Sequence, residues 1–359
     1  MKVVLIGIGQ AGGKVTQALA EYDHEMGFGA VQGAFAVNTA ESDLQNIDLD
    51  TMVIGQDRVK GHGVGGDNEL GAEIMQAEAT EVMDELDGRV ATNAEAVVLV
   101  AGLGGGTGSG GAPALASELQ RVYDLPIYTL GILPGRDEGA IYQANAGRSL
   151  KTVIRESTAT ILIDNDAWRE TGESVGEGFD AINDQIAQRL GLLFASGEIV
   201  EGVGESVVDS SEIINTLRGG GIACVGYASA DSSEDAGENV NTITSLARSA
   251  LLTSMSLPNA VDAEAALLVV AGEPSRISRK GVERARSWLE DETGSLQVRG
   301  GDFPLSTDRL AALVLLGGVE RSTRVQEFMD RAREAATNRE KQESDPAEAF
   351  ANEDLEGLF

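Results

Sequence analysis

The sequence predicts an α/β fold: a Rossmann-like, doubly wound and mostly parallel sheet, then a long central helix, then a second, smaller α+β domain. Two observations predict this arrangement. Strand-like and helix-like segments alternate from residue 1 to about 170, which is typical of a parallel sheet with helices on both faces. Glycine clusters directly follow two of the strand-like segments, at the edge where such sheets bind their ligands.

Apolar runs mark the expected strands, and longer amphipathic segments mark the helices. In the first domain we expect strands at Val3–Ile8, Gly33–Asn38, Met52–Ile54, Ala96–Leu103, Pro126–Leu133 and Ala159–Asp164, with helices at 12–22, 68–87, 112–123 and 139–155. The long helix covers Gly178–Ser196. In the second domain we expect strands at Ile222–Tyr227, Ala265–Ala271 and Arg309–Gly317, and helices at Ser211–Leu217, Asn239–Leu251 and Ser278–Glu292.

These segments divide the chain into four parts. They are a ligand-binding domain (1–177), a central helix with its linker (178–204), a second domain (205–328) and an acidic tail (329–359). The tail is rich in Glu and Asp, so we expect it to be disordered. Its spaced apolar residues, Phe350, Leu355, Leu358 and Phe359, would let it bind a partner protein as a short helix; a plain solubilising tail is the alternative.

Charge and composition narrow the possible partners. The 359 residues carry 58 acidic and 27 basic side chains, for a net charge of −31. Such a surface repels nucleic acid, and its self-repulsion is screened at molar salt, so we expect a halophilic organism and no nucleic-acid partner. The sequence shows neither a signal peptide nor an apolar run of membrane-spanning length, which predicts a cytoplasmic protein without a membrane span. A single cysteine, Cys224, excludes an internal disulfide.

The segment Gly104–Gly110 reads GGGTGSG and lies between a strand and a helix. Without Cβ atoms, several backbone N–H groups can converge on one anion, and the following helix directs its positive end to the same place. Thr107 and Ser109 would add hydroxyl donors. No lysine stands in or beside this loop, so it differs from the common phosphate loop of NTPases, and a metal ion is expected to help balance the charge.

A second glycine cluster, Gly7–Gly12, fits the G-x-G-x-x-G pattern of dinucleotide-binding proteins. Such a site also requires an acidic residue at the end of the next strand, where this chain has Asn38. An NAD-dependent oxidoreductase is therefore an alternative that the sequence disfavours.

The two glycine clusters, the order of the loops and the long middle helix resemble the tubulin/FtsZ superfamily of GTPases. GGGTGSG stands here as that family writes it, and the acidic composition is most similar to the CetZ group of haloarchaea. The resemblance implies GTP and GDP binding with Mg²⁺, a head-to-tail homopolymer, GTP hydrolysis between subunits and a role in cell shape. A GTP-binding regulator that does not polymerise is the alternative.

The resemblance also implies roles for particular residues. Nucleotide contacts in the loops would come from Gly9, Gln10, Ala11, Gly12, Gly13, Lys14, Asn38, Gly104, Gly105, Gly106, Thr107 and Gly108. Glu138 would hold the ribose, and Asn165, Phe179 and Asn183 would bind the base. Gln10 and, as an outer-sphere contact, Asp67 would assist the metal. FtsZ has an arginine where this chain has Tyr142, and whether Tyr142 or Arg136 replaces it is open.

Catalysis would fall to Asp209 and Glu212, in a loop that enters the nucleotide pocket of the next subunit in this family. At a spacing of three residues on a starting helix, both carboxylates share one face, where they could orient water for attack on the γ-phosphate. The same residues would also serve as a helix cap, which is compatible with catalysis. The family's asparagine two positions earlier is Val207 here, a departure that would slow hydrolysis or weaken the subunit contact.

Overall fold

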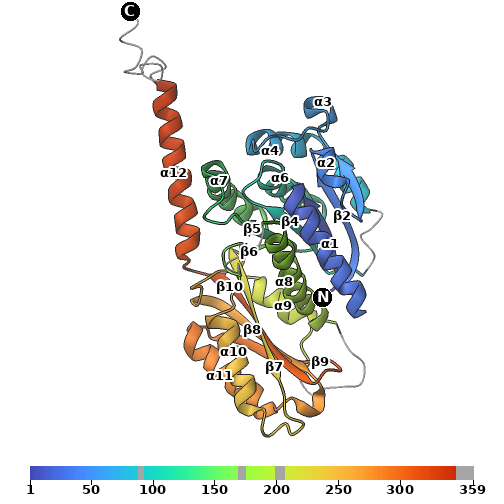
Figure 1. The fold of residues 1–359 in the computed structure, drawn as a ribbon, viewed down its shortest axis with the longest axis vertical. Helices are drawn as coiled ribbons and strands as arrows, with labels where there is room; N and C mark the ends of the chain where they lie inside the picture. Colours follow the sequence, from blue (N-terminus) through green and yellow to red (C-terminus); the bar gives the residue numbers. More distant parts are fainter. Residues whose placement is uncertain (88–92, 169–174, 199–206, 345–359) are drawn as a thin grey trace, which may run out of the picture.

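The computed structural model describes residues 1–87, 93–168, 175–198 and 207–344. A single ten-stranded sheet runs through the molecule in the order β3-β2-β1-β4-β5-β6-β7-β10-β8-β9 (Figure 1). Neighbours from β3 to β7 are parallel, β10 is antiparallel to both β7 and β8, and β9 is again parallel to β8. The two halves join where β6 pairs with β7 over only two residue pairs.

The first half of the sheet contains β1 (Val3–Ile8), β2 (Val31–Asn38), β3 (Asp50–Val53), β4 (Ala96–Gly102), β5 (Ile127–Leu133) and β6 (Ala159–Asp164). Its helices are α1 (Gly9–Met26), α2 (Glu41–Leu44), α3 (Gln56–Val59), α4 (Asn68–Ala77), α5 (Ala79–Asp87), α6 (Thr107–Val122) and α7 (Ala140–Glu156).

The long helix α8 (Val175–Ser196) precedes the second half. There the strands are β7 (Ile222–Asp231), β8 (Ala263–Gly272), β9 (Gln297–Pro304) and β10 (Arg309–Val319). The helices are α9 (Ser210–Leu217), α10 (Val240–Leu252), α11 (Arg279–Thr293) and α12 (Thr323–Ser344), with a short 3₁₀ turn at Pro274–Arg276.

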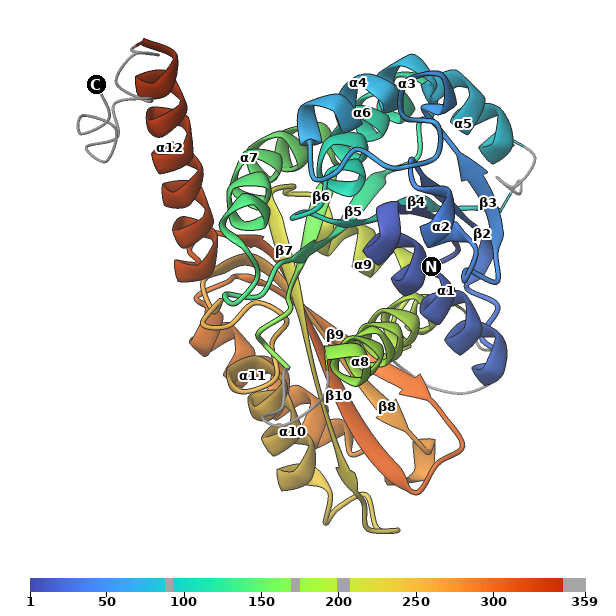
Figure 2. The same cartoon turned by 45° about the horizontal axis from the view of Figure 1, so that its top comes forward.

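Apolar residues cover both faces of the sheet, which is why its central strands read as continuous hydrophobic runs. Along β1, Val4 and Ile6 pack into the core beneath α4 to α7, whereas Val3 and Leu5 pack into the core beneath α1, α8 and α9. Figure 2 shows α8 lying beside α1 on this second face. The doubly wound, mostly parallel sheet is therefore confirmed.

Several boundaries differ from the expected ones. The segment 68–87 forms two helices that break at Glu78, and α6 begins at Thr107 rather than at residue 112. The short helices α2 and α3 were not expected, nor was β9, whose two glycines, charged residues and terminal proline hide the strand pattern. These differences are local, since each concerns a single element, a helix end or a break within one expected helix.

Helix α12 continues to Ser344, so part of the segment expected to be a disordered tail is helical. It lies beside α7 (Figures 1 and 2). Phe328 of α12 is fully buried there, and a Cβ added at Gly147 of α7 would lie 2.1 Å from the carbonyl oxygen of Phe328. The tail residues predicted to bind a partner lie outside the described residues. No helix in the described part of the chain is long and apolar enough to cross a membrane.

Candidate nucleotide-binding site

Two helices start side by side at the carboxyl ends of β1 and β4. Helix α1 begins at Gly9, whose φ of 74° favours glycine, and α6 begins at Thr107. A Cβ at Gly9 would lie 3.1 Å from the backbone nitrogen of Gly108, and one at Gly12 would lie 2.2 Å from the carbonyl oxygen of Val100. Only glycines allow these approaches, which place the free N–H groups of two helix N-termini next to each other.

This convergence favours an anionic ligand. Helix N-termini carry partial positive charge, and neither α1 nor α6 has an acidic residue in its first turn, although the chain as a whole has a net charge of −31. A Cβ at Gly105 would meet nothing within 4 Å, so the loop faces open space at that point. The two glycine clusters that the sequence singled out therefore form one cradle.

The hydroxyl groups of the second cluster have different environments. The hydroxyl of Ser109 donates to the carbonyl oxygen of Gly105, so the expectation that it faces the ligand is wrong. This bond tightens the first turn of α6 instead. The hydroxyl of Thr107 lies 2.7 Å from that of Thr39 and joins the loop to the end of β2. Thr107 remains a candidate ligand contact.

Asn38 is buried at the end of β2 and organises its own loop. Its side-chain oxygen accepts from the N–H groups of Thr39 (2.8 Å) and Ala40 (3.3 Å), and its amide donates to Asp43 at 3.1 Å. Asp43 also accepts from the amide of Gln10, which is exposed at the start of α1, at 3.5 Å. Sequence reasoning missed Asp43, which lies in the short helix α2 just after β2.

Oxygen atoms beside the cradle fit Mg²⁺, which binds few protein ligands and keeps several waters. Gln10 and Asp43 would supply an amide and a carboxylate oxygen next to the ligand's phosphates. The described residues contain no cluster of three His, Cys, Asp or Glu side chains that would hold a metal without such phosphates. Asp67, the other predicted metal contact, caps α4 by accepting from the N–H of Leu70 at 3.0 Å.

The loop before α4 packs directly on the glycine cradle. A Cβ at Gly106 would lie 2.4 Å from a methyl carbon of Val64, and one at Gly110 would lie 2.0 Å from the carbonyl oxygen of Asn68. The loop Gly61–Asn68 is thereby brought to the site. Displacement of this loop would disturb the cradle, because the close contacts include backbone atoms of Asp67 and Asn68.

Asn145 is a site residue that sequence reasoning missed. It is buried on α7, and its amide donates to the carbonyl oxygens of Gly66 (2.7 Å) and Gly104 (3.1 Å). One side chain thus ties the loop before α4 to the glycine loop after β4. Ser149, one turn later on α7, similarly donates to the carbonyl oxygen of Ser109 at 2.7 Å. The one sequence signal for these contacts is the spacing of four residues between Asn145 and Ser149, which places both polar side chains on the same face of α7.

We expect Asn145→Ala to lower the free energy of unfolding by about 1–3 kcal/mol, because two carbonyl oxygens lose their donor in a buried site. Nucleotide binding should weaken as well, since the two loops are no longer joined. Denaturant unfolding and nucleotide titration would measure both effects. Lys151→Ala, an exposed change on the same helix, is the control. If the two variants behave alike, the link through Asn145 is unimportant.

Glu138 and Asn165 meet at the carboxyl ends of β5 and β6. A carboxylate oxygen of Glu138 accepts from the backbone N–H of Gly135 (2.7 Å) and from the amide of Asn165 (3.4 Å). The predicted ribose and base contacts are therefore neighbours. Arg136 instead pairs with Asp166 (3.4 Å) and Glu327 (3.3 Å), away from the cradle.

Tyr142 is the better placed of the two candidates for the missing arginine. It is 42% exposed, and its Cβ lies close to the glycine loop: a Cβ added at Gly104 would be 3.2 Å from it. On α8, Phe179 and Asn183 are half-buried, and this helix runs beside α1. Lys14 is exposed in the second turn of α1.

Asp209 and Glu212 lie at the opposite edge of the sheet. Asp209 caps α9 by accepting from the N–H of Glu212 at 3.1 Å. The next residue, Ser210, donates to Glu95 at 2.6 Å, directly before the first residue of β4. The glycine loop follows the other end of β4, and a strand of seven residues spans roughly 20 Å. The predicted catalytic carboxylates therefore lie far from the cradle of their own chain.

The two carboxylates have different electrostatic surroundings. Glu212 is half-buried, and burial raises its pKa above the ordinary value. Asp209 is exposed, and the hydrogen bond from Ser211 lowers its pKa. A carboxylate with a raised pKa is the better proton acceptor, so Glu212 is the stronger candidate for a base.

Comparison with known proteins agrees with this geometry. Residues 2–173 match the model of the tubulin/FtsZ family GTPase domain, and residues 172–334 match that of the C-terminal domain of tubulin-like CetZ. The tubulin-like protein CetZ2 of Haloferax volcanii is 64% identical over 360 residues, covering 100% of both chains. The chain belongs to the CetZ group of the tubulin/FtsZ family.

Solved CetZ structures share the fold closely. A GTPγS-bound protofilament of CetZ2 from Haloferax volcanii superposes with a TM-score of 0.91 at 64% identity, covering 95% of this chain and 100% of that one. The GDP-bound monomer of CetZ1 from the same organism gives 0.87 at 50% identity, covering 94% and 100%. The G-x-G-x-x-G pattern thus belongs to a tubulin-like GTPase domain, which removes the ground for an NAD-dependent oxidoreductase.

Proposed function

We propose that this protein is a cytoskeletal GTPase that assembles head to tail, and that a second copy completes each GTP site. The positions of Asp209 and Glu212 carry this proposal. They lie at the edge of the sheet opposite the glycine cradle, so one chain cannot bring them to its own nucleotide. Stacking two copies in the same orientation brings α9 of one copy toward the cradle of the other.

The cradle supplies what triphosphate binding requires. The N-termini of α1 and α6 would bind the phosphates, and Thr107 would add a hydroxyl donor. Glu138 would accept from the ribose hydroxyls, and the amides of Asn165 and Asn183 would pair with the guanine edge while Phe179 stacks on the ring. Bound Mg²⁺ would neutralise phosphate charge; Gln10 and Asp43 would hold it, and Asp67 would remain an outer contact.

Hydrolysis would need little more than a positioned water. Phosphoryl transfer depends mainly on orientation and on stabilising charge that develops on the phosphate oxygens. Glu212 of the incoming copy would accept the proton of the attacking water, and Asp209 would hold the first turn of α9 in place. Since the catalytic groups arrive with the next subunit, GTP would persist in the monomer and be hydrolysed in the polymer, which would then disassemble.

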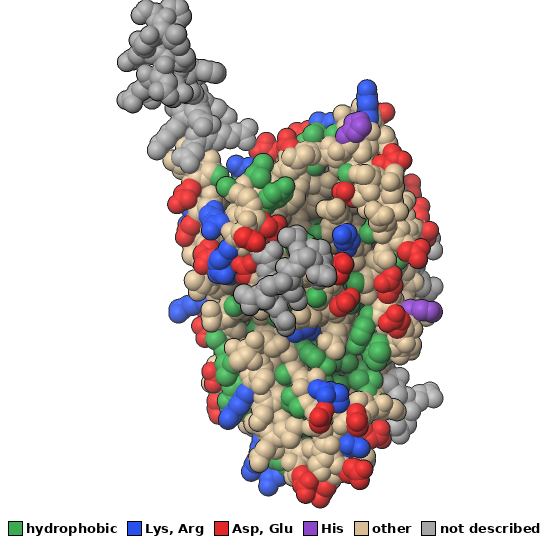
Figure 3. All heavy atoms as spheres, viewed as in Figure 1, with side chains coloured by type: hydrophobic (Ala, Val, Ile, Leu, Met, Phe, Trp, Pro, Cys, Tyr) green, Lys and Arg blue, Asp and Glu red, His purple; other side chains and the backbone are tan. Residues whose placement is uncertain are grey.

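The relatives support assembly, because the CetZ2 structure is described as a protofilament with GTPγS bound. We place the filament in the cytoplasm and assign it to the control of cell shape, following the resemblance to the CetZ group. Acidic side chains are spread over the face seen in Figure 3, so assembly should require enough salt to screen repulsion between copies.

GTP hydrolysis per molecule should rise steeply above a threshold protein concentration. The experiment measures phosphate release against protein concentration in molar KCl with Mg²⁺, with light scattering followed in parallel. A common threshold for both signals is expected, because assembly creates the active site. A flat, measurable rate per molecule would contradict the shared site. Tight GTP binding without turnover or scattering would favour a regulator that does not polymerise.

A further inference from the structure

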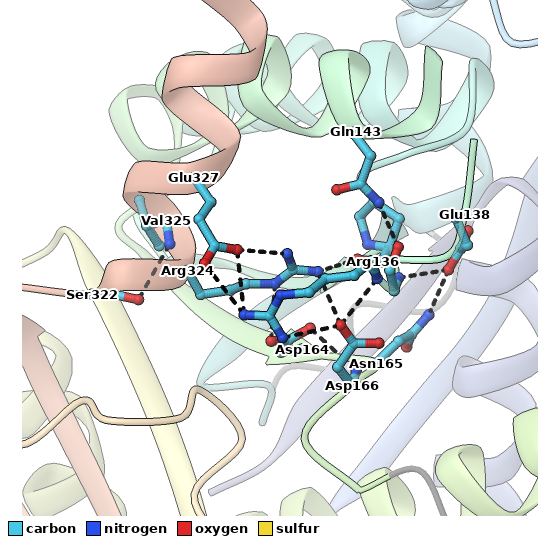
Figure 4. A network of polar contacts seen from close by, with 12 residues as sticks. Arg136, Glu138, Gln143, Asp164, Asn165, Asp166, Ser322, Arg324, Val325 and Glu327 are labelled. Atoms are coloured by element: carbon cyan, nitrogen blue, oxygen red, sulfur yellow. Dashed lines mark hydrogen bonds and ion pairs between the residues drawn. The ribbon is translucent and has the colours of Figure 1, made fainter. Parts of the chain in front are cut away.

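A buried arginine stands at the start of α12, beside the loops assigned to the ribose and base. Arg324 is 2% exposed, and its guanidinium bonds to Asp164 (3.1 Å) and Glu327 (3.0 Å). Its central carbon also lies 4.3 Å from the ring centroid of Phe328. Figure 4 shows the side chain at the centre of a polar network between α12 and the ends of β5 and β6.

Arg324 contacts both loops that carry the proposed nucleotide contacts. One nitrogen donates to the carbonyl oxygen of Pro134 at 2.7 Å, after β5, and to a carboxylate oxygen of Asp166 at 3.4 Å, after β6. The same oxygen of Asp166 accepts from the backbone N–H of Arg136 at 3.0 Å. These bonds fix the two loops against each other from behind.

The fixed loops present Glu138 and Asn165 on their other side. Glu138 accepts from the N–H of Gly135, which follows Pro134 directly, and from the amide of Asn165, which stands between Asp164 and Asp166. Arg324 thus bonds directly to Pro134, the sequence neighbour of Gly135, which donates to Glu138. It also bonds directly to both sequence neighbours of Asn165. A shift of the guanidinium would move both contacts together.

An arginine suits this place for electrostatic and geometric reasons. Three carboxylates converge here, from Asp164, Asp166 and Glu327, and burial raises the pKa of Asp164 while the charge of Arg324 opposes that shift. The planar guanidinium offers five donors in fixed directions, which a lysine cannot reproduce. Arg324 therefore offsets part of the negative charge of these carboxylates and also sets the spacing of the two loops.

We propose that Arg324 is a positioning residue for ribose and base recognition, and that docking of the first turn of α12 is coupled to nucleotide binding. The proposal rests on the function proposed above for Glu138 and Asn165. Because coupling between two sites is reciprocal, bound nucleotide should hold α12 in place, and an undocked α12 should weaken nucleotide binding. The C-terminal helix thereby becomes a means of regulating the GTP site.

The first test compares Arg324→Met with Arg333→Met, an exposed arginine on the same helix. Affinities of folded monomers are measured for GTP, for 2′,3′-dideoxy-GTP, which lacks the ribose hydroxyls, and for ITP, which lacks the 2-amino group. We expect Arg324→Met to bind GTP about tenfold more weakly. The ratio of its affinity for GTP to that for 2′,3′-dideoxy-GTP, and the ratio of its affinity for GTP to that for ITP, should both fall toward one. Arg333→Met should match the wild type. An equal loss for all three nucleotides would overturn a positioning role.

The second test needs no variant. Hydrogen exchange of the backbone amides of residues 325–328 is measured in the wild type with and without GDP. Slower exchange with GDP is expected, and unchanged exchange would overturn the coupling.

Arg324→Lys keeps the charge but not the planar guanidinium, so it should give intermediate affinity ratios in the first test. It replaces Arg324→Met there if Arg324→Met does not fold. Failure of the wild type to prefer GTP would instead contradict the proposed function.

Discussion

Replacing Glu212 by Gln should lower GTP turnover by at least about 100-fold while GTP affinity stays unchanged. The glutamine keeps the size of the side chain and the cap of α9, which is made by Asp209. It removes the only function proposed for the carboxylate, acceptance of a proton from the attacking water. Filaments of the variant should therefore assemble with GTP and persist longer than those of the wild type.

The measurement is phosphate release at a protein concentration well above the assembly threshold. Glu283→Gln on α11, an exposed glutamate, is the matched control and should turn over at the wild-type rate. The acid limb of the pH–rate profile should lie above the range of a free glutamate, since the pKa of Glu212 is raised by burial, and should vanish in Glu212→Gln. Unchanged turnover in Glu212→Gln would remove this residue from the mechanism.

A mixing experiment tests whether Glu212 acts on the neighbouring subunit. Gly105→Asp should fold, because a Cβ there meets nothing within 4 Å, but its carboxylate would repel phosphate. Each variant alone should be inactive. Mixed filaments should partly recover turnover. In them, a Glu212→Gln subunit holds GTP in its intact cradle, and a neighbouring Gly105→Asp subunit supplies the intact Glu212 carboxylate. No recovery in mixed filaments would indicate that the site is not shared.

Gly110→Ala should lower the free energy of unfolding by at least about 3 kcal/mol and abolish nucleotide binding. The added Cβ would lie 2.0 Å from the carbonyl oxygen of Asn68 and 2.7 Å from the backbone nitrogen of Ala72. Both atoms belong to the backbone of α4, which would have to move away from α6. The loop before α4, which forms one wall of the cradle, would move with it.

Urea unfolding in molar KCl measures this effect, and Gly105→Ala in the same glycine-rich segment is the control. Its Cβ points into open space and its φ is not in the left-handed region, so its stability should stay within about 1 kcal/mol of the wild type. Any weakening of GTP binding in the control would then report the cradle directly. Equal stability of Gly110→Ala and the wild type would contradict the close packing of α4 on α6.

Much of the fold could be predicted from local pattern. The apolar runs of β1, β4, β5 and β6 and their alternation with helices predicted the parallel sheet. Glycine-rich turns between strand and helix predicted the phosphate cradle and its edge of the sheet. Short or weakly patterned elements escaped prediction, as β9 did, because its residues have little strand preference and depend on pairing with β8.

The candidate site also has features that the sequence predicts and features that only the tertiary structure decides. The sequence by itself determined that glycine loops after β1 and β4 could bind an anion, because backbone freedom and helix direction are properties of short segments. Only the tertiary structure decided that Asn145 joins two loops, that Ser109 turns inward and that Arg324 bonds to the two loops that carry Glu138 and Asn165. Arg324 is 190 residues from its partner Pro134 and meets it because α12 packs on α7. Such contacts depend on which surfaces pack together, which no local pattern encodes.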